Sequence, residues 1–183
     1  MAGHFVRIVG GVVASAFMVG CAPAISVSSH VDRTVDFSRY HSFDWGPADA
    51  LPTGDPRLDR NPFFKDHVQG AVERQLRARG LELSSSSTPD LLIHYHASIA
   101  QRFDVNRADR TYGYCRTGDC PSDIVEYDAG TLVLDIMDAR TNMLLWRGWA
   151  QNNVEDMLRD ENRMARIIDR AVKQMLTRLP RQL

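Results

Sequence analysis

The chain has 183 residues, of which 25% are charged and 44% are hydrophobic, and its formal net charge is −1. This balance is ordinary for a globular domain, and the length allows one substantial core. Nucleic-acid binding usually requires an excess of basic residues, so we expect no nucleic-acid partner.

The first 20 residues have the pattern of a lipoprotein signal peptide. Arg7 is followed by an uncharged stretch over residues 8–19, which is too short to span a membrane as a helix. The stretch ends in Met18-Val19-Gly20-Cys21, which resembles a bacterial lipobox. The Cys21 thiol would accept a diacylglycerol, and acyl chains on one residue would anchor the chain firmly. The alternative is an ordinary secretory signal that happens to contain a cysteine.

This interpretation divides the chain into a signal peptide (1–20), a lipidated N-terminus with a short spacer (21–24) and a single domain (25–183). Membrane lipid is then the first partner, held through acylated Cys21. Ala22 stands where an aspartate would favour retention in the inner membrane. We therefore expect an outer-membrane lipoprotein that faces the periplasm.

The first half of the domain alternates between strand and helix patterns. We expect a strand over 25–31, a turn over 35–40, a strand over 41–45, a loop rich in proline and glycine from Gly46 to Pro56, and a helix from Asn61 to Gly80. Asn61 is a good N-cap, and Pro62 suits the first helical position.

The second half begins with a strand over residues 91–100, in which Leu91, Ile93 and Tyr95 share one face while His94 and His96 share the other. A long loop over 102–122, a β-hairpin over 130–150 and a helix over 160–179 follow. The order β-β-α-β-β-β-α predicts an α+β fold: a mostly antiparallel sheet with two helices packed on one face.

The remaining cysteines, Cys115 and Cys120, form an even pair in an oxidising compartment. Gly118 and Asp119 between them favour a turn, so we expect a disulfide that closes a small loop. Two thiols are only half of a zinc site, and the spacing differs from a redox C-x-x-C motif.

Several segments match a known family in order. They are the lipobox, Val35-Asp36-Phe37-Ser38-Arg39-Tyr40, Pro89-Asp90-Leu91-Leu92-Ile93, Gly130-Thr131-Leu132-Val133-Leu134-Asp135 and Leu145-Trp146-Arg147-Gly148. Together they resemble bacterial lipoproteins of the domain-of-unknown-function 4136 family. The resemblance covers nearly the whole mature chain. It implies an envelope lipoprotein with an α+β domain and supplies no catalytic residues.

His94 and His96 are the best candidates for a ligand site. Two histidines at this spacing project to the same side of a strand and could share a metal ion, with His67 or Asp135 as a third ligand. The simpler interpretation is that both are ordinary residues of a solvent-facing strand.

Asp135 and Asp138 could serve as paired carboxylates for acid–base chemistry. Asp138 is better explained as a turn residue, and Asp135 as the partner of Arg147 across the hairpin.

The sequence contains no motif for nucleophilic catalysis or nucleotide binding. Trp45, Trp146 and Trp149 could form an exposed aromatic patch, but we expect them to fill the core.

From the sequence as a whole we expect no enzyme and no cofactor, but an interaction or structural component of the cell envelope. Its open sheet face, or the loop around Tyr112 and Tyr114, would contact an envelope partner. The alternative is a small-ligand or metal binder that uses His94 and His96.

Overall fold

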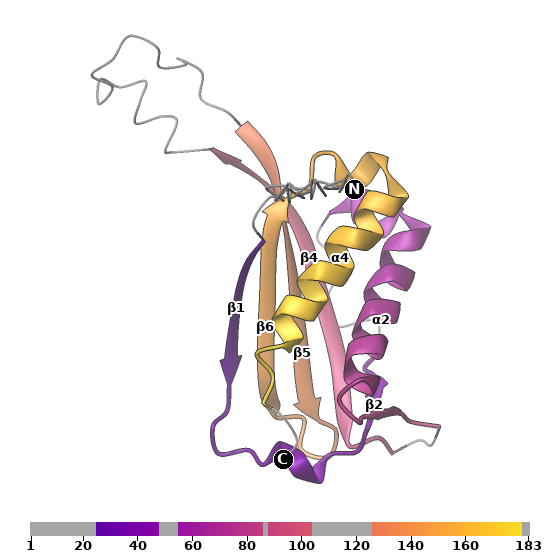
Figure 1. Ribbon diagram of the computed structural model, residues 1–183, viewed down its shortest axis with the longest axis vertical. Helices are drawn as coiled ribbons and strands as arrows, with labels where there is room; N and C mark the ends of the chain where they lie inside the picture. The colour runs from indigo at the N-terminus through magenta and orange to yellow at the C-terminus, as the bar shows by residue number, and fades with distance from the viewer. Residues whose placement is uncertain (1–24, 48–54, 86–87, 104–125, 181–183) are drawn as a thin grey trace, which may run out of the picture.

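A mixed sheet of six strands forms the centre of the molecule (Figure 1). The computed structural model describes residues 25–47, 55–85, 88–103 and 126–180, and the strands lie in the order β1-β6-β5-β4-β2-β3. Their bounds are Ser26–Val31 (β1), Ser42–Trp45 (β2), Glu82–Leu83 (β3), Leu91–Phe103 (β4), Glu126–Asp138 (β5) and Leu144–Asn153 (β6). The pairings among β1, β6, β5 and β4 are antiparallel, whereas β2 is parallel to β4 and to β3.

Two long helices, α2 (Pro62–Arg77) and α4 (Glu161–Leu176), lie side by side over one face of the sheet (Figure 1). The side chain of Asn61 accepts hydrogen bonds from the first-turn amides of α2, and Asp160 does the same for α4. These side chains satisfy amides that have no partner within the helix. The short helices are α1 (Pro56–Asp59) and the 3-10 helices η1 (Phe37–Arg39) and η3 (Met157–Arg159).

The α+β class is confirmed, and three details differ from expectation. Helix α1 lies at the end of the expected loop, because Asp55 caps a turn that begins with Pro56. Strand β3 pairs with β2 at the edge of the sheet through only two residues. Strands β4 and β5 are longer than expected, because they stay paired as far as Phe103 and Glu126.

The core lies between the sheet and the two long helices. Leu91, Ile93, Leu134 and Ile136 face the helices, because alternate residues of a strand point to the same side. The opposing stripe of α2 consists of buried side chains four residues apart, namely Phe64, Val68, Val72 and Leu76. Each large apolar side chain that is fully buried stabilises the fold by about 1.5–3 kcal/mol.

In the part of the chain that the structure describes, every helix is too short or too polar to cross a membrane.

Candidate functional site

The sheet face opposite α2 and α4 carries most of the candidate residues. We call it the open face and define it by a row of side chains that the strand register aligns from β4 to β1: His94, Asp135, Arg147 and His30. In the neighbouring row His96 lies opposite Val133, which pairs with Trp149 on β6. No described helix packs on this face, on which Trp149 is exposed and Asp135 is buried (Figure 1).

Asp135 and Arg147 form the strongest polar contact of the open face. Nε of Arg147 donates to Oδ1 of Asp135 at 2.6 Å, and Nη2 donates to Oδ2 at 2.6 Å. This two-point contact raises the pKa of Arg147 above its ordinary value. The expected pairing across the hairpin is confirmed, and both carboxylate oxygens of Asp135 are engaged.

The two histidines lie on the same face, as expected, but their surroundings differ. The His94 ring lies against Gly46, where an added Cβ would come within 2.1 Å of the imidazole. Nε2 of His96 lies 3.9 Å from Oδ2 of Asp135, while its Nδ1 is buried without a hydrogen-bond partner among the described residues. His94 is therefore packed against the backbone at Gly46, whereas His96 lies beside Asp135.

Among the described residues, no third metal ligand is in place beside the two histidines. His67 lies on α2, in the helix layer, where its Nε2 is 3.7 Å from Glu161, so its proposed role as a ligand was wrong. Asp135 is close to His96, but Arg147 occupies its oxygens. Within the described ranges, no group of three histidine, cysteine or acidic side chains has the geometry of a metal site.

Asp138 is a structural residue of the hairpin turn. Its carboxylate accepts hydrogen bonds from the amides of Thr141 at 2.8 Å and Arg140 at 3.0 Å, and from the Tyr40 hydroxyl at 3.0 Å. These bonds, led by the one from the Thr141 amide, lower the pKa of Asp138. The interpretation as a turn residue is confirmed.

The three tryptophans have three different environments. Trp146 is fully buried in the core. Trp45 also lies on the helix side, where its Nε1 donates to Glu73 at 3.1 Å and its ring meets Tyr95 edge-on. Trp149 is 38% exposed on the open face, so the expectation that all three fill the core was wrong for this residue. Successive residues of a strand point to alternate faces, so Trp146 and Trp149, which are three residues apart, point to opposite sides of the sheet. This spacing in the sequence indicated that only one of the two could be in the core.

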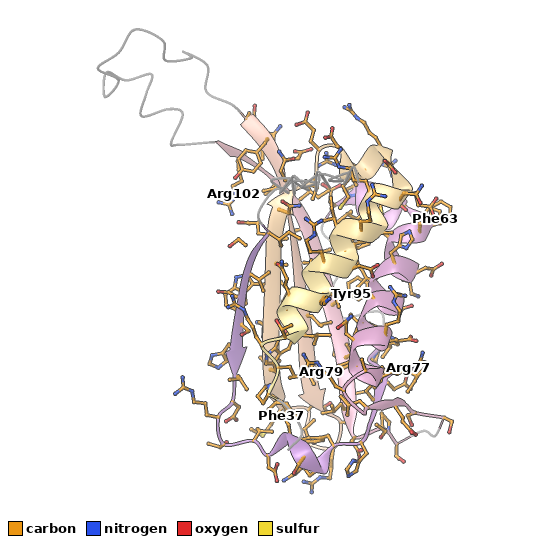
Figure 2. All side chains as sticks on the ribbon, in the orientation of Figure 1. Phe37, Phe63, Arg77, Arg79, Tyr95 and Arg102 are labelled. Atoms are coloured by element: carbon orange, nitrogen blue, oxygen red, sulfur yellow. The ribbon has the colours of Figure 1, made fainter. Side chains whose placement is uncertain are left out.

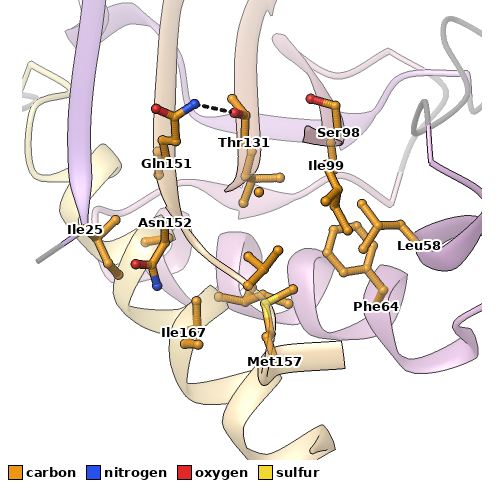
Figure 3. Close-up of a pocket in the computed structure, with 17 residues that line it drawn as sticks. Ile25, Leu58, Phe64, Ser98, Ile99, Thr131, Gln151, Asn152, Met157 and Ile167 are labelled. Atoms are coloured by element: carbon orange, nitrogen blue, oxygen red, sulfur yellow. Dashed lines mark hydrogen bonds between the residues drawn. The ribbon is translucent and has the colours of Figure 1, made fainter. Parts of the chain in front are cut away.

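Sequence reasoning missed an apolar cavity of about 50 Å³ between the sheet and the helices (Figure 3). Small side chains from three elements leave this space: Ala97 on β4, Ala150 on β6 and Ala171 on α4. Ile25 and Ile167 also line it, whereas Gln151 donates to Thr131 at 3.0 Å on the other side of the sheet (Figure 3).

Four expectations concern residues outside the described ranges. They are the signal peptide and spacer (1–24) with the lipidation of Cys21, the disulfide between Cys115 and Cys120, the part of the expected loop from residue 104 to residue 122, and the partner contact at Tyr112 and Tyr114. All remain predictions.

A model of the family described as "Domain of unknown function (DUF4136)" matches residues 27–181. A comparison with curated proteins gives no significant match.

Among solved structures, a PDZ domain protein from Parabacteroides distasonis is similar with a TM-score of 0.54 and 17% identity. The match covers 85% of this chain and 36% of the other, so the chain corresponds to about a third of that protein. A PelC dodecamer from Paraburkholderia phytofirmans matches with a TM-score of 0.47 and 9% identity, over 84% of this chain and 95% of that one. At these identities the likeness to the PDZ domain protein concerns the fold alone.

Proposed function

We propose that this chain, which belongs to the DUF4136 family, is a lipid-anchored component of the bacterial cell envelope that acts by binding a protein partner. The lipobox that ends in Cys21 supports the anchor. The absence of a recognisable catalytic motif in the sequence favours binding over catalysis.

The observation that carries the binding role is the exposed indole of Trp149 in the middle of the open face. Its strand neighbour on the same face is Arg147, whose side chain is 46% exposed while Asp135 holds its guanidinium in place. Tryptophan and arginine are the residue types most enriched at the centres of protein interfaces. A guanidinium fixed before binding also loses less conformational freedom when a partner docks.

In-cell photo-crosslinking tests this surface in the full-length protein. A photoreactive p-benzoylphenylalanine replaces Ser98, an exposed residue of the open face, or Lys173, an exposed residue of α4. We expect a reproducible envelope protein to be captured from position 98 and lost after Trp149→Ala. The same adducts from both positions, or an adduct that persists in the Trp149→Ala variant, would contradict the proposal.

The anchor has a separate test. Cys21→Ser removes the only thiol that the lipobox offers, so we expect unlipidated precursor to accumulate. Metabolic labelling with an alkyne-bearing fatty acid measures this directly. Normal acyl labelling of the Cys21→Ser protein would refute lipidation at this residue.

A further inference from the structure

The apolar cavity opens at one end of the molecule beside a polar hollow of about 350 Å³. Asn152, Met157 and Ile167 line both spaces, so the two adjoin each other. An apolar recess next to a polar hollow suits an amphiphilic molecule, with its tail in one part and its head group in the other.

The polar hollow carries an excess of arginine. Arg163, Arg166 and Arg170 follow one another along α4 at spacings of three and four, which place them on one side of the helix. Two carboxylates, those of Glu155 and Asp156, also line the hollow.

These arginines are not equivalent. Nη1 of Arg163 pairs with Asp156 at 3.1 Å, which neutralises one positive charge. Arg166 and Arg170 are exposed and make no ion pair with any residue in the described ranges. Arg166 and Arg170 outnumber the remaining carboxylate of Glu155, so the hollow has a net positive charge. Guanidinium binds phosphate through paired hydrogen bonds.

The position of the cavity in the chain points to the membrane. Ile25 lines the cavity, and Cys21 precedes it by four residues, which span at most about 14 Å when fully extended. Phe63 at the start of α2 is 47% exposed, and Figure 2 shows it at the end of the molecule where both long helices begin. If Cys21 is acylated, this end of the domain lies against the lipid surface.

We propose that this end of the domain binds an anionic phospholipid of the membrane that anchors Cys21. Arg166 and Arg170 hold the phosphate, and the end of one acyl chain enters the cavity past Ile167. The small size of the cavity limits it to the terminal part of a chain, so the rest of the lipid stays in the bilayer. This inference rests on the proposed lipid anchor.

The test uses the full-length lipoprotein in cells that are fed palmitate bearing a diazirine and an alkyne. After irradiation, mass spectrometry locates lipid adducts on the purified protein. We expect an adduct of phospholipid mass on peptides from residues 150–171. Arg166→Glu with Arg170→Glu should reduce its yield at least fivefold, whereas Arg178→Glu, at an exposed site beyond the other end of α4, should leave it within twofold.

A second variant, Ala150→Leu, fills the cavity without changing charge and should shift the adduct out of residues 150–171. Circular dichroism of each purified variant verifies that the fold is retained. An unchanged yield in the double arginine variant, or a crosslink from the Cys21-linked acyl chain in place of free phospholipid, would overturn the proposal. The same spectra report acylation of Cys21, so a failed anchor is distinguished from a failed lipid site.

Discussion

The guanidinium of Arg147 donates two hydrogen bonds of 2.6 Å to the carboxylate of Asp135, on a sheet face that no described helix covers. Asp135 is only 4% exposed, because Arg147 and neighbouring side chains shield it from water. A buried carboxylate that loses its cation retains the cost of its desolvation. The pair therefore contributes to stability as well as to the proposed interface.

We predict that Arg147→Ala lowers the free energy of unfolding by about 1–3 kcal/mol, in the range of hydrogen bonds to charged groups. The estimate stays below that for a fully buried pair, because the Arg147 side chain is 46% exposed. Urea unfolding of the purified domain measures the change. Gln151→Ala, four residues further along β6 and on the same face, is the matched control and should cost less. Equal losses in both variants would mean that the ion pair stabilises nothing beyond side-chain packing.

Substitution by alanine should lower the stability of the protein at Gly148 and raise it at Gly70. A Cβ at Gly148 would lie 2.2 Å from Cη2 of Trp146, and this indole is fully buried and cannot move aside. Gly148→Ala should therefore destabilise the protein by about 1–3 kcal/mol.

At Gly70, inside α2, the nearest atom to an added Cβ is Nη1 of the flexible Arg74 side chain at 3.2 Å. Alanine has a higher helix propensity than glycine, so Gly70→Ala should stabilise by up to about 1 kcal/mol. Thermal unfolding of both variants tests the pair of predictions. A stable Gly148→Ala protein would show that the packing of Trp146 on this backbone is loose.

The disulfide between Cys115 and Cys120 is a prediction from the sequence alone. In the lipidated protein Cys21 carries its acyl group on sulfur, so no thiol should react with iodoacetamide before reduction. After reduction, mass spectrometry should find two alkylated cysteines, Cys115 and Cys120. Two alkylations without prior reduction would rule the disulfide out.

The hairpin was the most predictable part of this molecule from sequence. Asp138 and Asn142 mark the turn, and Asn142 adopts the positive φ of 56° that asparagine tolerates better than most residues. A fixed turn fixes the register, which is why the contact between Asp135 and Arg147 could be foreseen. The cap Asn61 likewise marked the start of α2, whereas the cap of α4, Asp160, was recognised only in the structure.

Features that depend on contacts between distant segments of the chain could not be predicted from the sequence. Strand β3 has two paired residues and no hydrophobic pattern of its own, so only its contact with β2 defines it. The apolar cavity requires Ala97, Ala150 and Ala171 to meet from three elements. Each alanine looks like an ordinary core residue in the sequence, and the space between them exists only after packing.

The last prediction concerns acid stability and depends on Asp90 and Asp138. Oδ2 of Asp90 accepts from the amides of His41 at 2.8 Å and Ser42 at 3.0 Å, which ties the start of β4 to β2. The bond from the His41 amide is the main cause of a lowered pKa of Asp90, as the bond from the Thr141 amide is for Asp138. Both carboxylates are thus more acidic in the folded chain than in the unfolded chain, where aspartate has a pKa of about 3.9.

A lowered pKa in the folded state means that the unfolded chain binds more protons as the pH falls through this range. The stabilisation is complete above about pH 5 and is lost progressively below about pH 4, as the pH falls through the folded pKa values. Asp90→Asn and Asp138→Asn should each cost about 1–2 kcal/mol at pH 7 and progressively less toward pH 3, measured by urea unfolding. Asp66→Asn, at an exposed position of α2, controls for the loss of one negative charge. A cost that stays constant between pH 7 and pH 3 would show that these carboxylates do not link folding to proton binding.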